Sequence, residues 1–337
     1  MRQMCPVEYG YLAEELQGLV GKRFSKISKL ENGYRLRIGD ADVMCQPPIR
    51  LHITKYIEES EEADSLVEKI RKEVKGARLE GVSQINSDRV IMLDFGECRL
   101  YFEMFAKGNI ILVKEGKTIA ALRYEHWADR EIKPNMEYKT PKPPPTKISD
   151  ILSDKYVIVS LLKFPLGREY VEELLLRADI NEKIPGNRLS EKQIEKLENE
   201  LDKMRKEFSP YVFYDGGKPI AFGLIKFSKY SNLETREFRT LSEAADEYYL
   251  ANQMPMEDKK VEKLKLRLAK QEEYLEELKK EEKEYKEKGD FVYANYEEIE
   301  KILRIASSSG MGEIEGKLSR YKAKLNKKEK SIEVDIQ

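Results

Sequence analysis

The residues of this 337-residue chain that are best suited to chemistry are charged side chains beside predicted strands and helices. Asp88 and Arg89 directly precede the apolar run Val90-Ile91-Met92-Leu93. An arginine at the mouth of a strand can bind a phosphate through two parallel hydrogen bonds. A neighbouring carboxylate can orient that arginine or accept from a ribose hydroxyl. The local pattern alone favours a simpler alternative, a turn or an exposed ion pair worth less than about 1 kcal/mol.

Other candidate residues are more isolated. Arg50 is interpreted either as a residue on the rim of a site or as a phosphate ligand. Glu8 falls in the first predicted helix, where an exposed helix charge is the simpler interpretation. His52 and His126 are the two histidines of the chain, and their separation does not predict a metal centre or a catalytic triad. Trp127 could stack on a base, but packing is the more common role of such a residue.

The charge balance limits the possible partners. The chain has 61 Lys+Arg and 62 Asp+Glu, a formal net charge of −1, which excludes a uniformly basic nucleic-acid binder. A balanced sum can still hide a locally basic face. Charged residues make up 36% of the chain, against about 25% in ordinary domains. The abundance of Lys and Glu suggests a heat-adapted source.

Cysteine usage and hydropathy predict a cytoplasmic protein. Cys5, Cys45 and Cys98 are far apart and form no CxxC motif, so we expect buried thiols in a reducing compartment. The longest apolar run, residues 156–162, is far shorter than the ~20 residues of a membrane span. The first residues carry no hydrophobic signal segment.

The elements that must position these residues can be read from periodicity. Leucines at helical spacing predict a helix over residues 6–20, and a second helix is expected over 60–75. Short apolar runs separated by glycine turns predict strands over 23–54 and 78–122, with a hairpin at Asn32-Gly33. The strands follow one another too closely in the sequence to leave room for the helical connections that parallel strands need, so we predict a mostly antiparallel α+β domain.

The second half of the chain has a different character. The proline-rich segment 139–147 predicts a stiff linker and a domain boundary. The apolar spacing in residues 161–171 predicts two helical segments around a turn that contains Gly167, which is typical of a helix-hairpin-helix. Any αα-hairpin needs such a turn, so phosphate binding is one alternative there. A capped helix over 190–207 and a β-hairpin over 211–228 are expected to follow.

Beyond residue 257 the sequence predicts a coiled-coil arm. Apolar residues recur at the a and d positions of one heptad register, namely Val261, Leu264, Leu268, Leu275, Leu278 and Tyr285. Such a seam implies a returning helix or a partner, including a second copy of the chain. We therefore predict three domains: 1–147, 148–256 and 257–337, the last being the arm and the start of a truncated middle domain.

Several segments in a fixed order resemble the NFACT family, which includes the bacterial factor RqcH and was first described as fibronectin-binding-protein-like. Residues 69–79, 88–93 and 103–112 look like its N-terminal domain. The resemblance extends to residues 48–54, to the helix-hairpin-helix and to the charged arm, and so covers essentially the whole chain. It implies an N-terminal fold like that of formamidopyrimidine-DNA glycosylase. The family's C-terminal NFACT-R domain has no counterpart here, so we expect an N-terminal fragment, of archaeal origin.

The resemblance also implies a function. Family members bind the large ribosomal subunit (rRNA) that still carries peptidyl-tRNA. They hold incoming aminoacyl-tRNA, chiefly alanyl-tRNA, so that a C-terminal tail is added without mRNA. The ribosome forms the peptide bonds, so the chain is expected to be a tRNA-positioning factor and not an enzyme. No cofactor, metal or membrane is implied.

Individual site residues carry over from the family motifs. Its Asp-Arg pair, needed for tail synthesis, falls on Asp88 and Arg89. Its first-helix acidic residue falls on Glu8, where many relatives have the shorter Asp. Arg50, Arg71, Lys72 and Arg89 are then expected to contact phosphates of tRNA or the ribosome. Gly108 and Asn109 match a Gly-Asn turn, which like Gly167 is expected to be structural.

Two other functions are compatible with the sequence. Glycosylases of the related fold use a free N-terminal proline as an amine nucleophile, followed by a glutamate. Pro6 and Glu8 are internal here, and no four-cysteine zinc finger is present, which disfavours a DNA glycosylase or lyase. A coiled-coil scaffold that makes no RNA contact is the third possibility.

Overall fold

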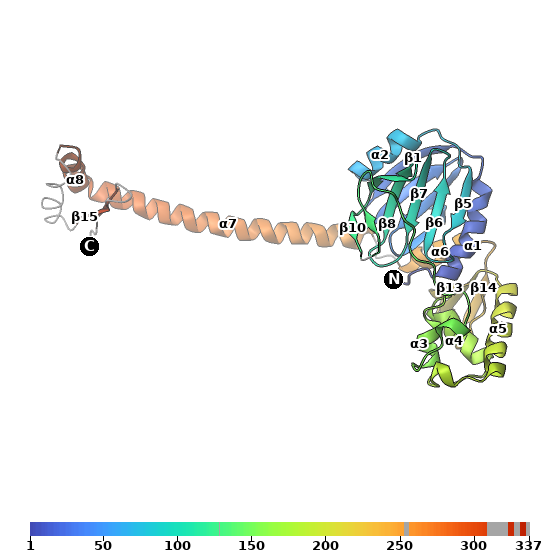
Figure 1. Cartoon of the computed structure of the whole chain (residues 1–337). Helices are drawn as coiled ribbons and strands as arrows, with labels where there is room; N and C mark the ends of the chain where they lie inside the picture. Colours follow the sequence, from blue (N-terminus) through green and yellow to red (C-terminus); the bar gives the residue numbers. More distant parts are fainter. Residues whose placement is uncertain (128, 253–255, 309–322, 327–330, 335–337) are drawn as a thin grey trace. The chain divides into compact units, whose positions relative to one another are not determined.

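The computed structural model describes residues 1–127, 129–252, 256–308, 323–326 and 331–334 (Figure 1). The chain forms two compact units, Met1–Gln253 and Met254–Gln337. The first unit contains two large antiparallel sheets, a two-stranded ribbon and a helical module with a three-stranded sheet, and it holds every candidate site residue. No described helix combines the length and the apolar character that a membrane span requires.

The first sheet is a four-stranded antiparallel meander. Its strands are β1 (Phe24–Leu30), β2 (Gly33–Ile38), β3 (Ala41–Gln46) and β4 (Arg50–Thr54), in that spatial order. The hairpin expected at Asn32-Gly33 is present but shifted, because Leu30 pairs with Gly33 and the turn residues are 31 and 32. Glycine is needed at position 33 for another reason: a Cβ there would lie 2.3 Å from the carbonyl oxygen of Cys45.

The second sheet has five antiparallel strands. They are β5 (Gly81–Gln84), β6 (Val90–Asp94), β7 (Cys98–Glu103), β8 (Asn109–Lys114) and β9 (Lys117–Ala121), again in sequence order. A short ribbon of β10 (Glu125–His126) and β11 (Glu131–Ile132) follows. The predicted antiparallel α+β class is therefore confirmed.

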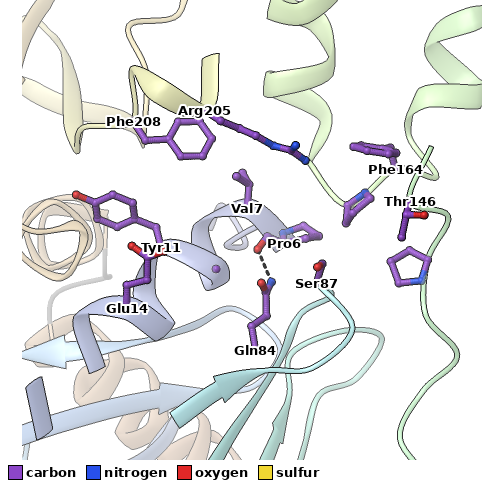
Figure 2. Close-up of a pocket in the computed structure, with 13 residues that line it drawn as sticks. Pro6, Val7, Tyr11, Glu14, Gln84, Ser87, Thr146, Phe164, Arg205 and Phe208 are labelled. Atoms are coloured by element: carbon purple, nitrogen blue, oxygen red, sulfur yellow. Dashed lines mark hydrogen bonds between the residues drawn. The ribbon is translucent and has the colours of Figure 1, made fainter. Parts of the chain in front are cut away.

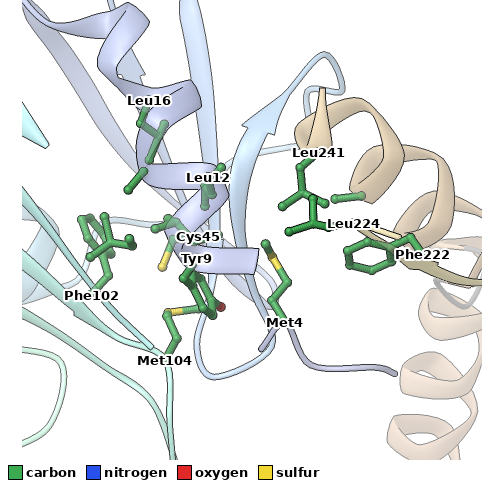
Figure 3. Packing of buried hydrophobic residues seen from close by; sticks show 14 of the residues in the cluster. Met4, Tyr9, Leu12, Leu16, Cys45, Phe102, Met104, Phe222, Leu224 and Leu241 are labelled. Carbon is green, nitrogen blue, oxygen red and sulfur yellow. The ribbon is translucent and has the colours of Figure 1, made fainter. Parts of the chain in front are cut away.

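Two helices flank these sheets. Helix α1 (Pro6–Leu16) continues into the 3-10 turn η1 (Gln17–Leu19) and packs on β5 and β6, whereas α2 (Ser65–Val74) packs on β1 and β9. Helix α2 begins five residues later than the sequence suggested, because the side chain of Asp64 caps it by accepting from the backbone N–H of Val67. Figure 3 shows Tyr9 of α1 next to Met104, beside the second sheet.

The helical module follows the proline-rich segment. The predicted helix-hairpin-helix is confirmed as α3 (Val157–Leu161) and α4 (Arg168–Arg177), and α5 (Glu191–Lys206) starts at the expected Ser190–Gln193 capping box. The predicted hairpin forms from β12 (Tyr211–Asp215) and β13 (Lys218–Gly223). Strand β14 (Glu234–Glu237) and helix α6 (Leu241–Asn252) complete the module, and neither was predicted. Three further 3-10 turns are η2 (Ser149–Ile151), η3 (Gly186–Arg188) and η4 (Ser228–Tyr230).

A large hydrophobic core links the two halves of the first unit. Buried side chains between Met4 and Tyr249 form a cluster that includes both sheets, α1, α4 and α6. A smaller cluster lies on the second sheet and β11 and consists of Val90, Tyr101, Ile111, Val113 and Ile132. Figure 3 shows Met4 lying toward Phe222 and Leu224 of the helical module. Segment 139–147 contains no helix or strand, and the boundary expected there stays a prediction.

The second unit consists of the predicted long helix and a small terminal part. Helix α7 (Met256–Ala294) spans 39 residues and is followed by α8 (Tyr296–Ser308). Strands β15 (Ala323–Asn326) and β16 (Ser331–Val334), which were not predicted, pair antiparallel. The seam residues Leu268, Leu275, Leu278 and Tyr285 are exposed within this unit. The side chains of Val261 and Leu264 lie outside the described residues.

Candidate functional site

A cavity of about 400 Å³ lies where the sheets of the first unit meet the helix-hairpin-helix. Four segments form its wall: the chain leading into α1, the loop before β6, the proline-rich segment at Pro144, and the turn between α3 and α4. The lining includes Cys5, Pro6, Asp88, Arg89, Lys163, Gly167 and Arg168. The fold thus brings Asp88, Arg89 and Gly167 together from positions that are far apart in the sequence.

Asp88 closes the tight turn of residues 85–88, because its backbone N–H donates to the carbonyl of Ile85 at 3.0 Å, and Arg89 leads from this turn into β6. The carboxylate of Asp88 accepts from the backbone N–H of Arg89 at 2.7 Å, and it forms no ion pair with a described residue. Of the two simpler alternatives, the turn is present, and the exposed Asp88–Arg89 ion pair is wrong. The half-buried guanidinium of Arg89 makes no hydrogen bond or ion pair within the described part of the chain. Its donors are available to a ligand in the cavity.

Gln84 fixes this turn against α1. Its amide nitrogen donates to the carbonyl oxygens of Pro6 at 2.7 Å and Asp88 at 2.9 Å, and Figure 2 shows the first of these bonds. Pro6 lies at the start of α1, and its nitrogen belongs to the peptide bond with Cys5. An amide nitrogen has no free electron pair for attack, so Pro6 is not an amine nucleophile.

The opposite wall presents the N-terminus of α4. Gly167 precedes this helix with a φ of +110°, and no side chain in the described part of the chain caps the helix. The N–H groups of its first turn therefore lack both an intrahelical partner and a capping partner, and the helix dipole favours an anion there. Lys163 is exposed and makes no ion pair with a described residue, while Arg168 pairs only with Glu172 on the next turn. This wall is suited to a phosphate.

Glu8 lies beneath the cavity and is fully buried, so the interpretation as an exposed helix charge is wrong. Its oxygens accept from both terminal nitrogens of Arg2 at 3.0 and 2.6 Å, from the backbone N–H of Cys5 at 2.9 Å, and from the Tyr170 hydroxyl at 3.1 Å. Burial opposes the charged form of Arg2, but Glu8 and Glu169 outweigh it and raise the pKa of Arg2. Glu8 thus ties α1 to α4.

The three other predicted phosphate ligands lie outside the cavity. Arg50 is 3% exposed, and its guanidinium stacks 4.7 Å from the Tyr249 ring centre and donates to Gln46 at 3.1 Å. Its expected place on a rim is wrong because α6 covers this end of β4. Arg71 donates twice to the carbonyl of Ile27, at 3.0 and 2.8 Å. Lys72 is exposed on α2, away from the cavity.

The predicted Gly-Asn turn lies on the second sheet. Gly108 has a φ of +70°, and a Cβ there would lie 2.4 Å from the Cβ of Pro47. The Asn109 side chain donates to the carbonyl of Arg123 at 2.9 Å and accepts from its N–H at 3.0 Å. These contacts give both residues a structural role.

His52 is fully buried between β4 and α6. Burial, and then the charge of Arg50, lower its pKa to about 3, so the imidazole is neutral at ordinary pH. Its Nδ1 lies 2.9 Å from the carbonyl of Ile53, and its Nε2 has no hydrogen-bond partner among the described residues.

His126 is exposed, and the neighbouring Trp127 stacks under the guanidinium of Arg130 at 4.4 Å. Within the described ranges no group of three metal-ligating side chains occurs.

A second groove of about 570 Å³ adjoins the cavity and shares Pro6, Phe164 and Pro165 with it (Figure 2). The side chains of Tyr11, Phe208 and Arg205 also line this groove. Sequence reasoning did not single out Gln84, Arg2 or Arg205, because nothing in their spacing marks them. Lys163 could have been found, since it stands inside the predicted helix-hairpin-helix turn.

Comparison with known proteins identifies relatives over most of the chain. A family model described as NFACT N-terminal and middle domains matches residues 11–337. The chain is 28% identical over 346 residues to the archaeal Rqc2 homolog aRqcH of Methanocaldococcus jannaschii, covering 89% of this chain and 51% of that protein. It is 24% identical over 369 residues to the human ribosome quality control complex subunit NEMF, covering 90% and 34%. The chain thus spans between a third and a half of these relatives.

A solved structure shares the fold. The crystal structure of the fibrinogen binding protein from Staphylococcus aureus superposes with a TM-score of 0.58 at 19% identity, over 73% of this chain and 98% of that one. The family model covers nearly all residues, including both units of the structure. The chain therefore belongs to the family of proteins with NFACT N-terminal and middle domains.

Proposed function

We propose that the chain is the RNA-binding portion of a cytoplasmic ribosome quality-control factor. In this proposal it binds the large ribosomal subunit that carries peptidyl-tRNA and positions aminoacyl-tRNA for mRNA-independent tailing with alanine. The names of its archaeal and human relatives support ribosome quality control as the process. The ribosome would supply peptide-bond formation, and no residue of this chain is assigned a catalytic role.

The cavity that contains Arg89 carries the proposal. Arg89 and Lys163 present positive charge with no carboxylate partner among the described residues, and the start of α4 lines the same space. Backbone N–H groups, a guanidinium and an ammonium converge on one volume, which is the donor set expected for a nucleic-acid phosphate. Asp88 shapes the turn and leaves a carboxylate oxygen near the ligand, where it could accept from a ribose hydroxyl or a base amino group.

The proposal can be tested by measuring the binding of tRNA and of large ribosomal subunits to this chain. Fluorescence anisotropy with labelled tRNA, and co-sedimentation with subunits that carry peptidyl-tRNA, would be run across a salt series. We expect Arg89→Ala to weaken tRNA binding about tenfold and to reduce the slope of log K against log salt by about one, the value for one phosphate contact.

Two further variants distinguish an effect of the charge of Asp88 on binding from an effect on the turn, and a specific effect of Arg89 from that of losing any cation. Asp88→Asn keeps an acceptor for the N–H of Arg89 and should retain the turn, so a loss of binding would be due to the charge of Asp88. Lys192→Ala removes a cation from an exposed position of α5 that lines neither the cavity nor the adjoining groove, and it should leave binding unchanged. If wild type binds neither tRNA nor subunits at low salt, or if Lys192→Ala matches Arg89→Ala, the proposed function is wrong.

A further inference from the structure

A second group of cations lies on the edge of the first unit where β1 begins and α2 ends. This group, called the basic edge, comprises Arg23, Lys26, Lys72, Lys75 and Arg78, all of them exposed. Residues 22–29 and 69–78 contain nine Lys or Arg and a single acidic residue, Glu73. The whole chain, by contrast, has slightly more acidic than basic residues. The balanced total therefore hides a locally basic surface.

Backbone contacts hold the two segments of the basic edge side by side. The N–H of Phe24 donates to Ala77 at 2.9 Å, and the N–H of Gly76 donates back to Phe24 at 2.8 Å. Arg23 and Arg78 face each other across an antiparallel bridge. The five cations are thus brought together by tertiary contacts between strand and helix.

The cations of the basic edge are not neutralised internally. The guanidiniums of Arg23 and Arg78 donate to the carbonyl oxygens of Gly76 and Gly21, each at 2.8 Å, and not to carboxylates. Lys26, Lys72 and Lys75 form no ion pair within the described residues. The nearby Glu73 is already engaged by Lys69 and Lys114. Like charges directly opposite each other oppose folding, so this arrangement lowers stability in the absence of an anionic partner.

The basic edge is separate from the cavity. The cavity lies at the start of α1 and beyond the end of β5, where Pro6 and Asp88 are found. The basic edge lies at the other end of both elements, next to Gly21 and Glu80. Helix α1 with η1 spans 14 residues from Pro6 to Leu19, which corresponds to about 20 Å. Figure 1 likewise shows α2 at the end of the unit remote from α3 and α4.

We propose that the basic edge is a second RNA-binding surface, which holds the phosphate backbone of a double-helical RNA segment without reading its sequence. Lysines on flexible stems follow a row of phosphates, and the segments 22–29 and 69–78 present no exposed aromatic side chain for stacking on a base. This inference rests on the proposed RNA-binding function, but its residues are distinct from those of the cavity. In this inference, Lys72 contacts RNA at the basic edge, whereas Arg89 contacts RNA in the cavity.

The test compares two charge-matched triple variants of the full chain. Lys26→Gln/Lys72→Gln/Lys75→Gln alters the basic edge, and Lys192→Gln/Lys196→Gln/Lys218→Gln removes the same charge from exposed positions of α5 and β13. The probe is a fluorescein-labelled 20-base-pair RNA hairpin, together with a hairpin of scrambled sequence. We expect the first variant to lower the salt slope by two to three and the affinity at least about tenfold, equally for both hairpins. The second variant should change the affinity less than about twofold.

The outcomes separate this inference from the proposed function. If Arg89→Ala weakens tRNA binding while the basic-edge variant leaves the hairpin slope unchanged, the basic edge is not an RNA surface and the cavity assignment stands. If the control triple variant lowers the slope as much, the effect is one of general charge and the inference is wrong. If the basic-edge variant alone has an effect, the basic edge stands and the cavity assignment fails. Absence of RNA binding by wild type overturns both.

Discussion

At the scale of single residues, the contacts of Glu8 explain how an acidic residue can affect a binding site without touching the ligand. Its carboxylate has four donors from Arg2, Cys5 and Tyr170, and no exposed surface. Tyr170 in turn accepts from the backbone N–H of Leu224 at 2.8 Å. The charge of Glu8 therefore joins the chain before α1, helix α4 and the end of β13 at one point beneath the cavity.

We predict that Glu8→Gln destabilises the first unit by roughly 3 kcal/mol, because it leaves the half-buried guanidinium of Arg2 without its main counter-charge. Urea denaturation followed by circular dichroism would measure this change. Arg2→Met/Glu8→Gln should cost less than the sum of the two single changes, since it removes both charges. Additive effects would show that the two side chains do not act as a pair.

His52 gives a prediction for the pH dependence of stability. Its folded-state pKa of about 3 is below the ordinary value of about 6.5, so the unfolded chain binds this proton first as the pH falls. His52 should therefore subtract about 1.4 kcal/mol of stability for each pH unit below 6.5, until the pH approaches 3. The measurement is the free energy of unfolding of wild type and His52→Gln between pH 7 and pH 4. Parallel curves for the two proteins would contradict the prediction.

At the scale of elements, the turn between α3 and α4 depends on one glycine. Gly167 has a φ of +110°, and a Cβ there would lie 2.5 Å from the Cβ and 2.8 Å from the Sγ of Cys5. The absence of a side chain lets the start of α4 touch the chain that leads into α1. This contact holds the start of α4 at one wall of the cavity, and the bonds of Gln84 hold the turn before β6 at the opposite wall.

Gly167→Ala should therefore destabilise the chain by at least about 2 kcal/mol and weaken tRNA binding, because both the backbone conformation and the overlap with Cys5 are unfavourable. Thermal unfolding and the anisotropy assay would report the two effects. Gly18→Ala is the control, since position 18 has open space and no positive φ. Equal stability of the two variants would show that the turn tolerates a side chain.

At the scale of the whole molecule, the two units differ in how they are held together. The first unit buries a large hydrophobic core that includes both sheets and the helical module, whereas α7 exposes the apolar side chains of Leu268, Leu275 and Leu278, with 42–55% of each accessible. A heptad seam of this kind gains stability when another helix covers it. The expected partner for the isolated chain is a second copy of itself.

We predict that the chain self-associates through α7 at micromolar concentration. Sedimentation equilibrium should show a monomer–dimer equilibrium, which Leu275→Glu/Leu278→Glu shifts to monomer because charge at the seam cannot be desolvated. Glu276→Gln/Lys279→Gln, which changes neighbouring exposed positions, should leave the equilibrium unchanged. A wild-type chain that stays monomeric at 100-fold higher concentration would contradict the prediction.

The sequence alone determined the local elements, because each has a short-range cause. Helical spacing of leucines, the Ser190–Gln193 capping box and the glycine turn at 216–217 specify their structures through neighbouring residues. The order of short motifs was also sufficient to indicate the NFACT family. Strand β14 and helix α6 escaped prediction because their burial is set by distant partners, such as the contact of α6 with β4.

Only the tertiary structure decided which charged residues face solvent, which face the cavity and which are buried. Glu8, Arg50, Arg71 and Arg89 look equally polar in the sequence, yet Glu8 and Arg50 are buried, Arg71 binds a backbone carbonyl and Arg89 lines the cavity. The physical reason is that desolvation and ion pairing depend on side chains brought together from far along the chain. Arg2 reaches Glu169, and α6 covers Arg50, only after both halves of the first unit have packed.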